Sequence, residues 1–206
     1  MISEYISKLE QKIDLTYDQM NEIMSEVLSG KTDDVQNMSI LSNLSKKGET
    51  DDELLGMLDK MQELSLKITP KNNGTIIDMC GTGGDNKDTF NISTLSAFIT
   101  AGAGIKVAKH GNYGVSSSCG SSNVLENLGI RFSNDQGFIE SCIEKSGICI
   151  LHAPLFHPAM KHVAPIRREL GLKTFFNMLG PLVNPSSPNN QMVGVYSLEL
   201  ARLYSY

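Results

Sequence analysis

Ile105-Lys106-Val107-Ala108-Lys109-His110-Gly111-Asn112 is the stretch that decides the fold, because a short apolar strand leads directly into a turn rich in hydrogen-bond donors. The same order occurs upstream, where Thr75-Ile76-Ile77-Asp78 precedes Gly81-Thr82-Gly83-Gly84-Asp85, and downstream, where Ile148-Cys149-Ile150-Leu151 precedes His152. Helical patterns separate these strands. Strands that alternate with helices predict an α/β fold with a parallel sheet, and both turns then lie beyond the carboxyl ends of strands, where such sheets bind ligands.

The chain before Pro70 reads as entirely helical. Thr16 with Gln19 and Thr50 with Glu53 fit capping boxes. Two apolar stripes at helical spacing are expected to form core rather than a methionine-rich binding surface: Met20, Ile23, Met24, Val27 and Leu28, and then Leu54, Leu55, Leu58, Met61 and Leu64. A turn from Pro70 to Gly74 ends this region. Further along we expect a helix over Pro158–Gly171, a connection over Asn177–Pro188, a strand over Met192–Val195 and a final segment from Leu198 to Tyr206.

Composition excludes several classes of protein. With 206 residues, a net charge of −5 and a pI near 5.4, the chain has no general affinity for nucleic acid or for an anionic membrane. No apolar run is long enough to span a bilayer and no signal peptide precedes residue 20, so we expect a cytoplasmic protein. The cysteine spacing fits neither zinc nor a disulfide framework. We therefore expect reduced thiols, with Cys80, Cys142 and Cys149 in the core and Cys119 in the donor-rich loop.

The first glycine-rich turn favours an anion, because its backbone N–H groups can approach phosphate oxygens. It is not a Walker A loop, and position 86 is Asn where a dinucleotide fingerprint has its third glycine. A plain tight turn is the alternative. Asn91-Ile92-Ser93-Thr94 opens the next helix and could bind a diphosphate with its magnesium ion, unless Ser93 or Thr94 only caps that helix.

The second loop carries more chemistry. Lys109 and His110 supply a charge and an imidazole, and Gly111-Asn112 lets the backbone approach a ligand; a buried structural histidine is the alternative. The hydroxyls of Ser116, Ser117, Ser118, Ser121 and Ser122 precede a helix expected over Asn123–Leu128, which suits phosphate, although a flexible polar loop would look the same.

Arg167-Arg168-Glu169 is a charged run that could be a solvated helix face. The apolar, tightly punctuated segment from Thr174 to Pro185 follows it, so an arginine from this region could instead meet a carboxylate.

Together these motifs resemble the anthranilate phosphoribosyltransferase family. The resemblance rests on motifs that occur in the family's order: Gly81-Thr82-Gly83-Gly84-Asp85, Asn91-x-Ser93-Thr94, Lys109-His110-Gly111-Asn112, Val124-Leu125-Glu126, Val163–Gly171 and Phe176–Pro185. It covers the whole chain and roughly the first two thirds of a usual member. It implies a nucleoside phosphorylase/phosphoribosyltransferase-like fold, with a helical domain over 1–69 to which 158–185 returns, and an α/β domain over 74–157 and 186–206 that is incomplete at its C-terminus.

The resemblance also implies an activity: the amine of anthranilate attacks phosphoribosyl pyrophosphate in tryptophan biosynthesis, with magnesium (Mg2+) as cofactor. By matching position, anthranilate would meet Gly81, His110, Asn112 and Arg167, and Ser93 would bind the metal. Phosphoribosyl pyrophosphate would meet Gly81, Gly84, Asp85, Thr89, Asn91, Ile92, Ser93, Thr94, Lys109, His110, Gly111, Asn112, Tyr113, Gly114, Val115, Ser116, Ser117 and Ser121. A homodimer through the helical domain is the implied assembly.

Three departures from the family pattern are expected to matter. Tyr113 stands where the family commonly has Arg, and Ser118 where it commonly has Lys, so two cations are missing from the phosphate loop. The family's downstream Asp-Glu pair, which anchors magnesium, has no counterpart before Tyr206, and Asp51-Asp52-Glu53 lies in the helical region. Two alternatives therefore stay open: a truncated or diverged member that acts as a binding or assembly module, and a pyrimidine nucleoside phosphorylase.

Overall fold

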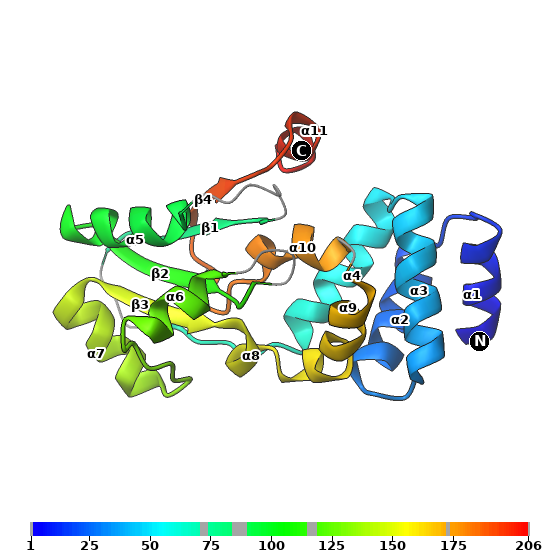
Figure 1. The fold of residues 1–206 in the computed structure, drawn as a ribbon, viewed down its shortest axis with the longest axis horizontal. Coiled ribbons are helices and arrows are strands. Elements are labelled where there is room, and N and C mark those ends of the chain that lie inside the picture. The colour runs from blue at the N-terminus through cyan, green and yellow to red at the C-terminus, as the bar shows by residue number, and fades with distance from the viewer. Residues whose placement is uncertain (1, 71–73, 84–89, 115–118, 172–173, 206) are drawn as a thin grey trace. The chain divides into compact units, whose positions relative to one another are not determined.

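The computed structural model describes residues 2–70, 74–83, 90–114, 119–171 and 174–205. Two compact units make up the chain (Figure 1). The helical unit contains Met1–Ser65 and His157–Val183, and the α/β unit contains Leu66–Phe156 and Asn184–Tyr206.

The helical unit begins with four helices that the sequence predicts. They are α1 (Ile2–Glu10), α2 (Tyr17–Leu28), α3 (Asp34–Lys47) and α4 (Asp51–Glu63). The later segment adds η1 (Pro158–His162), α9 (Ala164–Leu170), α10 (Phe175–Leu179) and η2 (Gly180–Val183), where η marks a 3-10 helix. The single helix expected over Pro158–Gly171 is thus wrong in detail, because a 3-10 turn comes first and α9 starts afresh beside Pro165. The connection expected over Asn177–Pro188 instead begins inside α10 and continues as η2.

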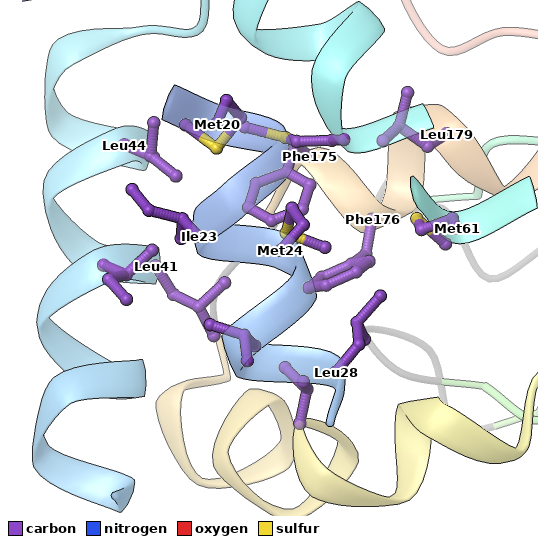
Figure 2. Packing of buried hydrophobic residues seen from close by; sticks show 14 of the residues in the cluster. Met20, Ile23, Met24, Leu28, Leu41, Leu44, Met61, Phe175, Phe176 and Leu179 are labelled. Carbon is purple, nitrogen blue, oxygen red and sulfur yellow. The ribbon is translucent and has the colours of Figure 1, made fainter. Parts of the chain in front are cut away.

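Apolar side chains from both segments form one core in the helical unit. Figure 2 shows Met20, Ile23 and Met24 of α2 beside Phe175 and Phe176 of α10. The first predicted stripe is confirmed, since all five of its residues are buried. The second is only partly right: Leu55 is 51% exposed and Leu64 is 37% exposed, while Met57 is buried instead.

Both predicted capping boxes are present, and the one at α4 also binds a residue outside the helix. Glu53 is fully buried, and its carboxylate accepts hydrogen bonds from the backbone N–H of Thr50 and Leu15, each at 2.9 Å. Lys47 donates to the same carboxylate at 2.9 Å and to Asp14 at 2.7 Å. Glu53 therefore joins the start of α4 to the loop between α1 and α2.

The α/β unit is built on a parallel sheet, which confirms the predicted fold class. Its strands are β1 (Ile76–Gly81), β2 (Lys106–Gly111), β3 (Ile148–His152) and β4 (Asn190–Gly194), in the order β3-β2-β1-β4. Strands β1 and β2 each run three residues past the end expected from their apolar runs, and β4 starts earlier than expected. Gly81 and Lys109-His110-Gly111 consequently belong to strands and have fixed backbones.

Helices α5 (Ile92–Gly102) and α7 (Gln136–Ser146) pack on opposite faces of this sheet. The unit also contains α6 (Ser121–Asn127), α8 (Ala153–Phe156) and α11 (Leu198–Leu203). The expected helix over Asn123–Leu128 thus begins two residues earlier. Because strand side chains alternate, Val107 packs toward α5, in one cluster with Ala97, whereas Ala108 packs toward α7, with Ile139 and Ile143.

All four cysteines are free thiols, as predicted. Cys80 and Cys149 are buried, Cys142 is partly buried and Cys119 is exposed. Across the part of the chain that the structure describes, no helix is long and apolar enough to cross a membrane.

Candidate ligand-binding site

The first predicted turn starts at the carboxyl end of β1. Gly83 has φ +65°, a conformation that glycine adopts without strain. The backbone N–H of Thr82 donates to the carbonyl of Gly194 at 3.0 Å, so the turn is tied to the end of β4. The candidate residues Gly84, Asp85 and Thr89 lie outside the described residues.

Helix α5 begins beside this turn, with Asn91 as its N-cap and no side-chain capping bond. Neither Ser93 nor Thr94 caps the helix, so the alternative of a purely structural cap is wrong. The Thr94 hydroxyl is buried and has no hydrogen-bond partner among the described residues, while Ile92 is exposed. Since buried hydroxyls normally find a partner, this helix start has binding capacity left over for an anion.

Lys109 lies inside the sheet rather than on the loop surface. Its side chain is 1% exposed, and its ammonium donates to the carbonyl of Met79 at 2.6 Å and to the hydroxyl of Ser93 at 3.4 Å. Burial lowers the pKa of Lys109, against the attraction of Asp78. Strand alternation directs this side chain toward α5, so it joins the two predicted motifs to each other.

His110 is also buried, as the alternative of a structural histidine anticipated. Its backbone N–H donates to Asp78 at 3.0 Å. Asp78 is fully buried, and burial raises the pKa of its carboxyl group. The prediction from the sequence assigned no role to Asp78, although a carboxylate inside an apolar strand was a visible signal.

Asn112 forms the turn that follows β2. Its carbonyl accepts from the Ser122 backbone at 3.1 Å and from the Ser121 hydroxyl at 3.2 Å. A Cβ atom on Gly111 would lie 2.6 Å from the Ser121 oxygen, so a side chain at Gly111 would displace this contact. The candidates Val115, Ser116 and Ser117, together with Ser118, lie outside the described residues.

Tyr113 and Gly114 complete the turn. The Tyr113 hydroxyl donates to Glu126 at 2.7 Å, and its ring meets His152 edge-on at 4.9 Å. Asn123 accepts from the backbone N–H of Gly114 at 3.1 Å. Tyr113 is therefore held against α6 and the end of β3.

His152 is the centre of a small aromatic cluster that sequence reasoning missed. Phe132 stacks on its ring at 4.3 Å, and the Ser122 hydroxyl lies 2.8 Å from its Nδ1. Burial lowers the pKa of His152, partly offset by Glu126. Only the position of His152 directly after an apolar strand hinted at this packing.

Arg167 belongs to the helical unit and is 9% exposed, so the alternative of a solvated charged face is wrong for this residue. Its guanidinium lies 4.8 Å from the centre of the Phe176 ring and donates to Asn177 at 3.4 Å. No described carboxylate pairs with it, and its Nε atom has no described hydrogen-bond partner. Burial lowers the pKa of Arg167 to about 10. The group remains a cation at neutral pH and has no counter-charge among the described residues.

Of the candidate residues, the α/β unit brings Ser93 and Lys109 together and joins Gly111, Asn112 and Ser121 into one turn. Gly81, exposed at the end of β1, and the α5 start complete the same edge of the sheet. The fold and these turns define an α/β protein of the parallel-sheet type whose candidate binding residues gather at the carboxyl ends of its strands, where such sheets bind ligands.

Comparison with known proteins places the chain more narrowly. Residues 73–206 match the family described as "Glycosyl transferase family, a/b domain", and residues 3–65 match "Glycosyl transferase family, helical bundle domain". The chain belongs to this glycosyl transferase family.

Its relatives include the anthranilate phosphoribosyltransferase of Nitrosopumilus maritimus, which is 59% identical over 97% of this chain and 57% of its own length. Among solved structures, the Thermus thermophilus anthranilate phosphoribosyltransferase is 37% identical with a TM-score of 0.82, covering 97% of this chain and 63% of its own. The Saccharomyces cerevisiae enzyme in complex with PRPP and Mg is 29% identical with a TM-score of 0.87, covering 99% and 61%. The resemblance predicted from the motifs is thus confirmed, and the chain spans 57–62% of the length of the first curated relatives it matches.

Proposed function

We propose that this protein is an anthranilate phosphoribosyltransferase. It transfers the phosphoribosyl group of phosphoribosyl pyrophosphate to the amine of anthranilate, as a step of tryptophan biosynthesis. The observation that carries the proposal is the buried Lys109, two residues before the Gly111–Asn112 turn. Its ammonium donates to the carbonyl of Met79, two residues before Gly81, and to the hydroxyl of Ser93 at the start of α5. The relatives' shared name supports the same conclusion.

Phosphoribosyl pyrophosphate suits this edge of the sheet because it carries phosphate groups at both ends. The pyrophosphate end would lie at Gly81 and the start of α5, where the first-turn N–H groups and the Thr94 hydroxyl, which has no partner among the described residues, favour an anion. The ribose phosphate end would lie at the turn from Gly111 to Gly114 and at Ser121. The other carried-over residues keep the roles that the resemblance implies.

Magnesium fits this edge only as a companion of the diphosphate. Among the described residues no group of three or more His, Cys, Asp or Glu side chains could hold a metal ion. The Ser93 hydroxyl is the one candidate ligand in the described α5 start, and it lies next to the Lys109 ammonium. Mg2+ commonly takes most of its ligands from substrate phosphates and water, so Ser93 would supply one oxygen of such a site. When bound, the ion would neutralise charge on the departing pyrophosphate.

Arg167 is the group we assign to the carboxylate of anthranilate, with Gly81, His110 and Asn112 as further contacts carried over from the family. A buried guanidinium without a counter-charge is costly, and an anionic ligand removes that cost. In the reaction, the amine nitrogen forms a bond to the anomeric carbon as the bond to pyrophosphate breaks, and the amine loses a proton. An aromatic amine is neutral at pH 7, so alignment and stabilisation of the leaving charge matter more than a strong base.

We further propose a cytoplasmic enzyme that forms a homodimer through its helical unit, as the family resemblance implies. The domain limits of 1–69 with 158–185, and 74–157 with 186–206, belong to the same proposal. The helical unit exposes apolar side chains that an interface would cover, among them Val35 at 78% and Leu55 at 51%. Sedimentation of the purified protein would test the dimer.

The test of the proposed reaction is ligand binding followed by turnover. Calorimetric titration should show that phosphoribosyl pyrophosphate binds with magnesium present, and that anthranilate then binds to the loaded protein. If neither ligand binds, or if a pyrimidine nucleoside with inorganic phosphate binds in their place, the proposal is wrong.

A further inference from the structure

The two central strands of the sheet stop pairing before they end. Within residues 76–81 and 106–111, all of which the structure describes, the register of β1 with β2 ends at Ile77 and Val107. By contrast, β1 pairs with β4 as far as Gly81, and β2 pairs with β3 as far as Gly111. The carboxyl ends of β1 and β2 are therefore each paired through the backbone with an outer strand, but not with each other.

Two side chains bridge these ends, one from each strand. The Lys109 ammonium of β2 donates to the Met79 carbonyl of β1 at 2.6 Å. The Asp78 carboxylate of β1 accepts from the His110 backbone N–H of β2 at 3.0 Å. Each strand thus bonds through a side chain to the backbone of the other, in place of the missing ladder.

Both bridging groups are shielded from water, with Lys109 1% exposed and Asp78 fully buried. Their opposite charges attract, and the remaining hydrogen-bonding capacity is used by neighbours: Gln191 donates to Asp78 at 3.2 Å, and Lys109 donates to Ser93 at 3.4 Å. Buried charge pairs often stabilise a fold no more than apolar residues of similar volume do. The distinctive effect of these two groups is geometric, because they tie the ends of β1 and β2 to each other where backbone pairing has stopped.

These two bonds lie directly before the two turns to which we assign a ligand. Gly81 follows Asp78 and Met79 on β1, and Gly111 follows Lys109 and His110 on β2. We propose that Asp78, with Lys109, is a positioning residue that sets the distance between the Gly81 turn and the Gly111–Asn112 turn, so that one ligand with phosphate groups at both ends binds both turns. This inference rests on the proposed function and adds Asp78 to its machinery.

A ligand that binds two turns depends on their separation, whereas a ligand that binds one turn does not. Asp78→Ala should therefore lower the affinity for phosphoribosyl pyrophosphate by about tenfold or more, because the lost bond is to a buried charged group. The affinity for inorganic pyrophosphate should stay within about threefold of the parent's. Gln191→Leu is the matched control, since it removes a partner of the same carboxylate and leaves the bond to His110 intact. That control should leave the ratio of the two affinities unchanged.

Calorimetric titration of parent, Asp78→Ala and Gln191→Leu gives the affinities, and amide hydrogen exchange at His110 in the ligand-free protein reports the bridge directly. Faster exchange at His110 in Asp78→Ala, together with the selective loss of phosphoribosyl pyrophosphate, supports the inference. An equal loss of both ligands, or unchanged affinity for phosphoribosyl pyrophosphate, overturns it.

Two further outcomes are decisive. If Asp78→Ala does not fold, Asp78→Asn, which keeps the volume and one acceptor oxygen, should show the same selectivity at about threefold or more, and an unselective loss in that variant overturns the inference. If the parent itself does not bind phosphoribosyl pyrophosphate, the proposed function is wrong. Amide exchange at His110 alone then tests whether Asp78 holds β1 to β2, and unchanged exchange in Asp78→Ala overturns that inference.

Discussion

Arg167→Met tests whether the buried guanidinium serves the ligand or the fold. In the structure, this group contacts the Phe176 ring at 4.8 Å and Asn177 at 3.4 Å, and no described carboxylate balances its charge. Methionine fills a similar volume without a charge. The substitution therefore removes the binding group and keeps most of the packing.

The two expected effects have opposite consequences. Losing the cation–π contact costs about 0.5–2 kcal/mol of unfolding free energy, whereas removing an unpaired buried charge returns an effective penalty of several kcal/mol. The variant should be as stable as the parent or more stable. Losing a charge-assisted bond to a carboxylate costs roughly 1.5–3 kcal/mol, which is a loss in anthranilate affinity of about 10- to 150-fold.

Urea unfolding and calorimetric titration of anthranilate into protein loaded with phosphoribosyl pyrophosphate measure these quantities. Arg168→Met is the control, because Arg168 is exposed and carries the same charge one residue away. It should change neither quantity. A destabilised Arg167→Met variant with parental anthranilate affinity would show that the guanidinium is structural and would refute its assignment to the carboxylate.

Three further predictions concern the rest of the fold. Glu53→Ala should lower the unfolding free energy by about 1–3 kcal/mol in urea titrations, because the N–H groups of Thr50 and Leu15 lose their acceptor while Lys47 keeps Asp14; a loss below about 0.5 kcal/mol would contradict the role we give to Glu53 in joining α4 to the preceding loop. Gly120→Ala should weaken phosphoribosyl pyrophosphate about tenfold, since its Cβ would lie 2.1 Å from the Gly114 nitrogen and overpacking moves the turn, whereas Gly102→Ala, which meets nothing within 4 Å, should bind like the parent. His152→Phe should flatten the decline in stability that occurs as the pH falls below about 6.5. The folded-state pKa of His152 is lowered from 6.5, so its contribution is present above that value and is lost as the pH falls; an equally steep decline in the variant would assign the acid sensitivity to other groups.

The parallel sheet and the helical region could be predicted because local patterns agreed with the tertiary structure there. The stripe from Met20 to Leu28 has one buried face, and the capping boxes at Thr16 and Thr50 both form. Strand ends were placed too early, since Lys109 and His110 look like loop residues until Asp78 and Met79 supply partners across the strands. A polar residue can be assigned to a strand only when its hydrogen-bond partners on neighbouring strands are known.

In the candidate site too, local sequence patterns predicted some features, whereas those that depend on distant partners were missed. Sequence motifs identified turns such as the one at Gly111 and Asn112, because glycine and asparagine are themselves typical of turns. They did not identify Asp78 or His152, whose partners lie about 30 residues away along the chain. Arg167 was identified by resemblance, and only its burial beside Phe176 distinguishes it from the exposed Arg168.

The measurement that tests the central claim most directly is the release of pyrophosphate by the purified protein. We expect release that requires both phosphoribosyl pyrophosphate and anthranilate, depends on magnesium, and falls in Arg167→Met through weaker anthranilate binding. Two results would contradict the assignment of this protein to anthranilate phosphoribosyl transfer. One is pyrophosphate release at the same rate with and without anthranilate, and the other is phosphorolysis of a pyrimidine nucleoside with no reaction of phosphoribosyl pyrophosphate.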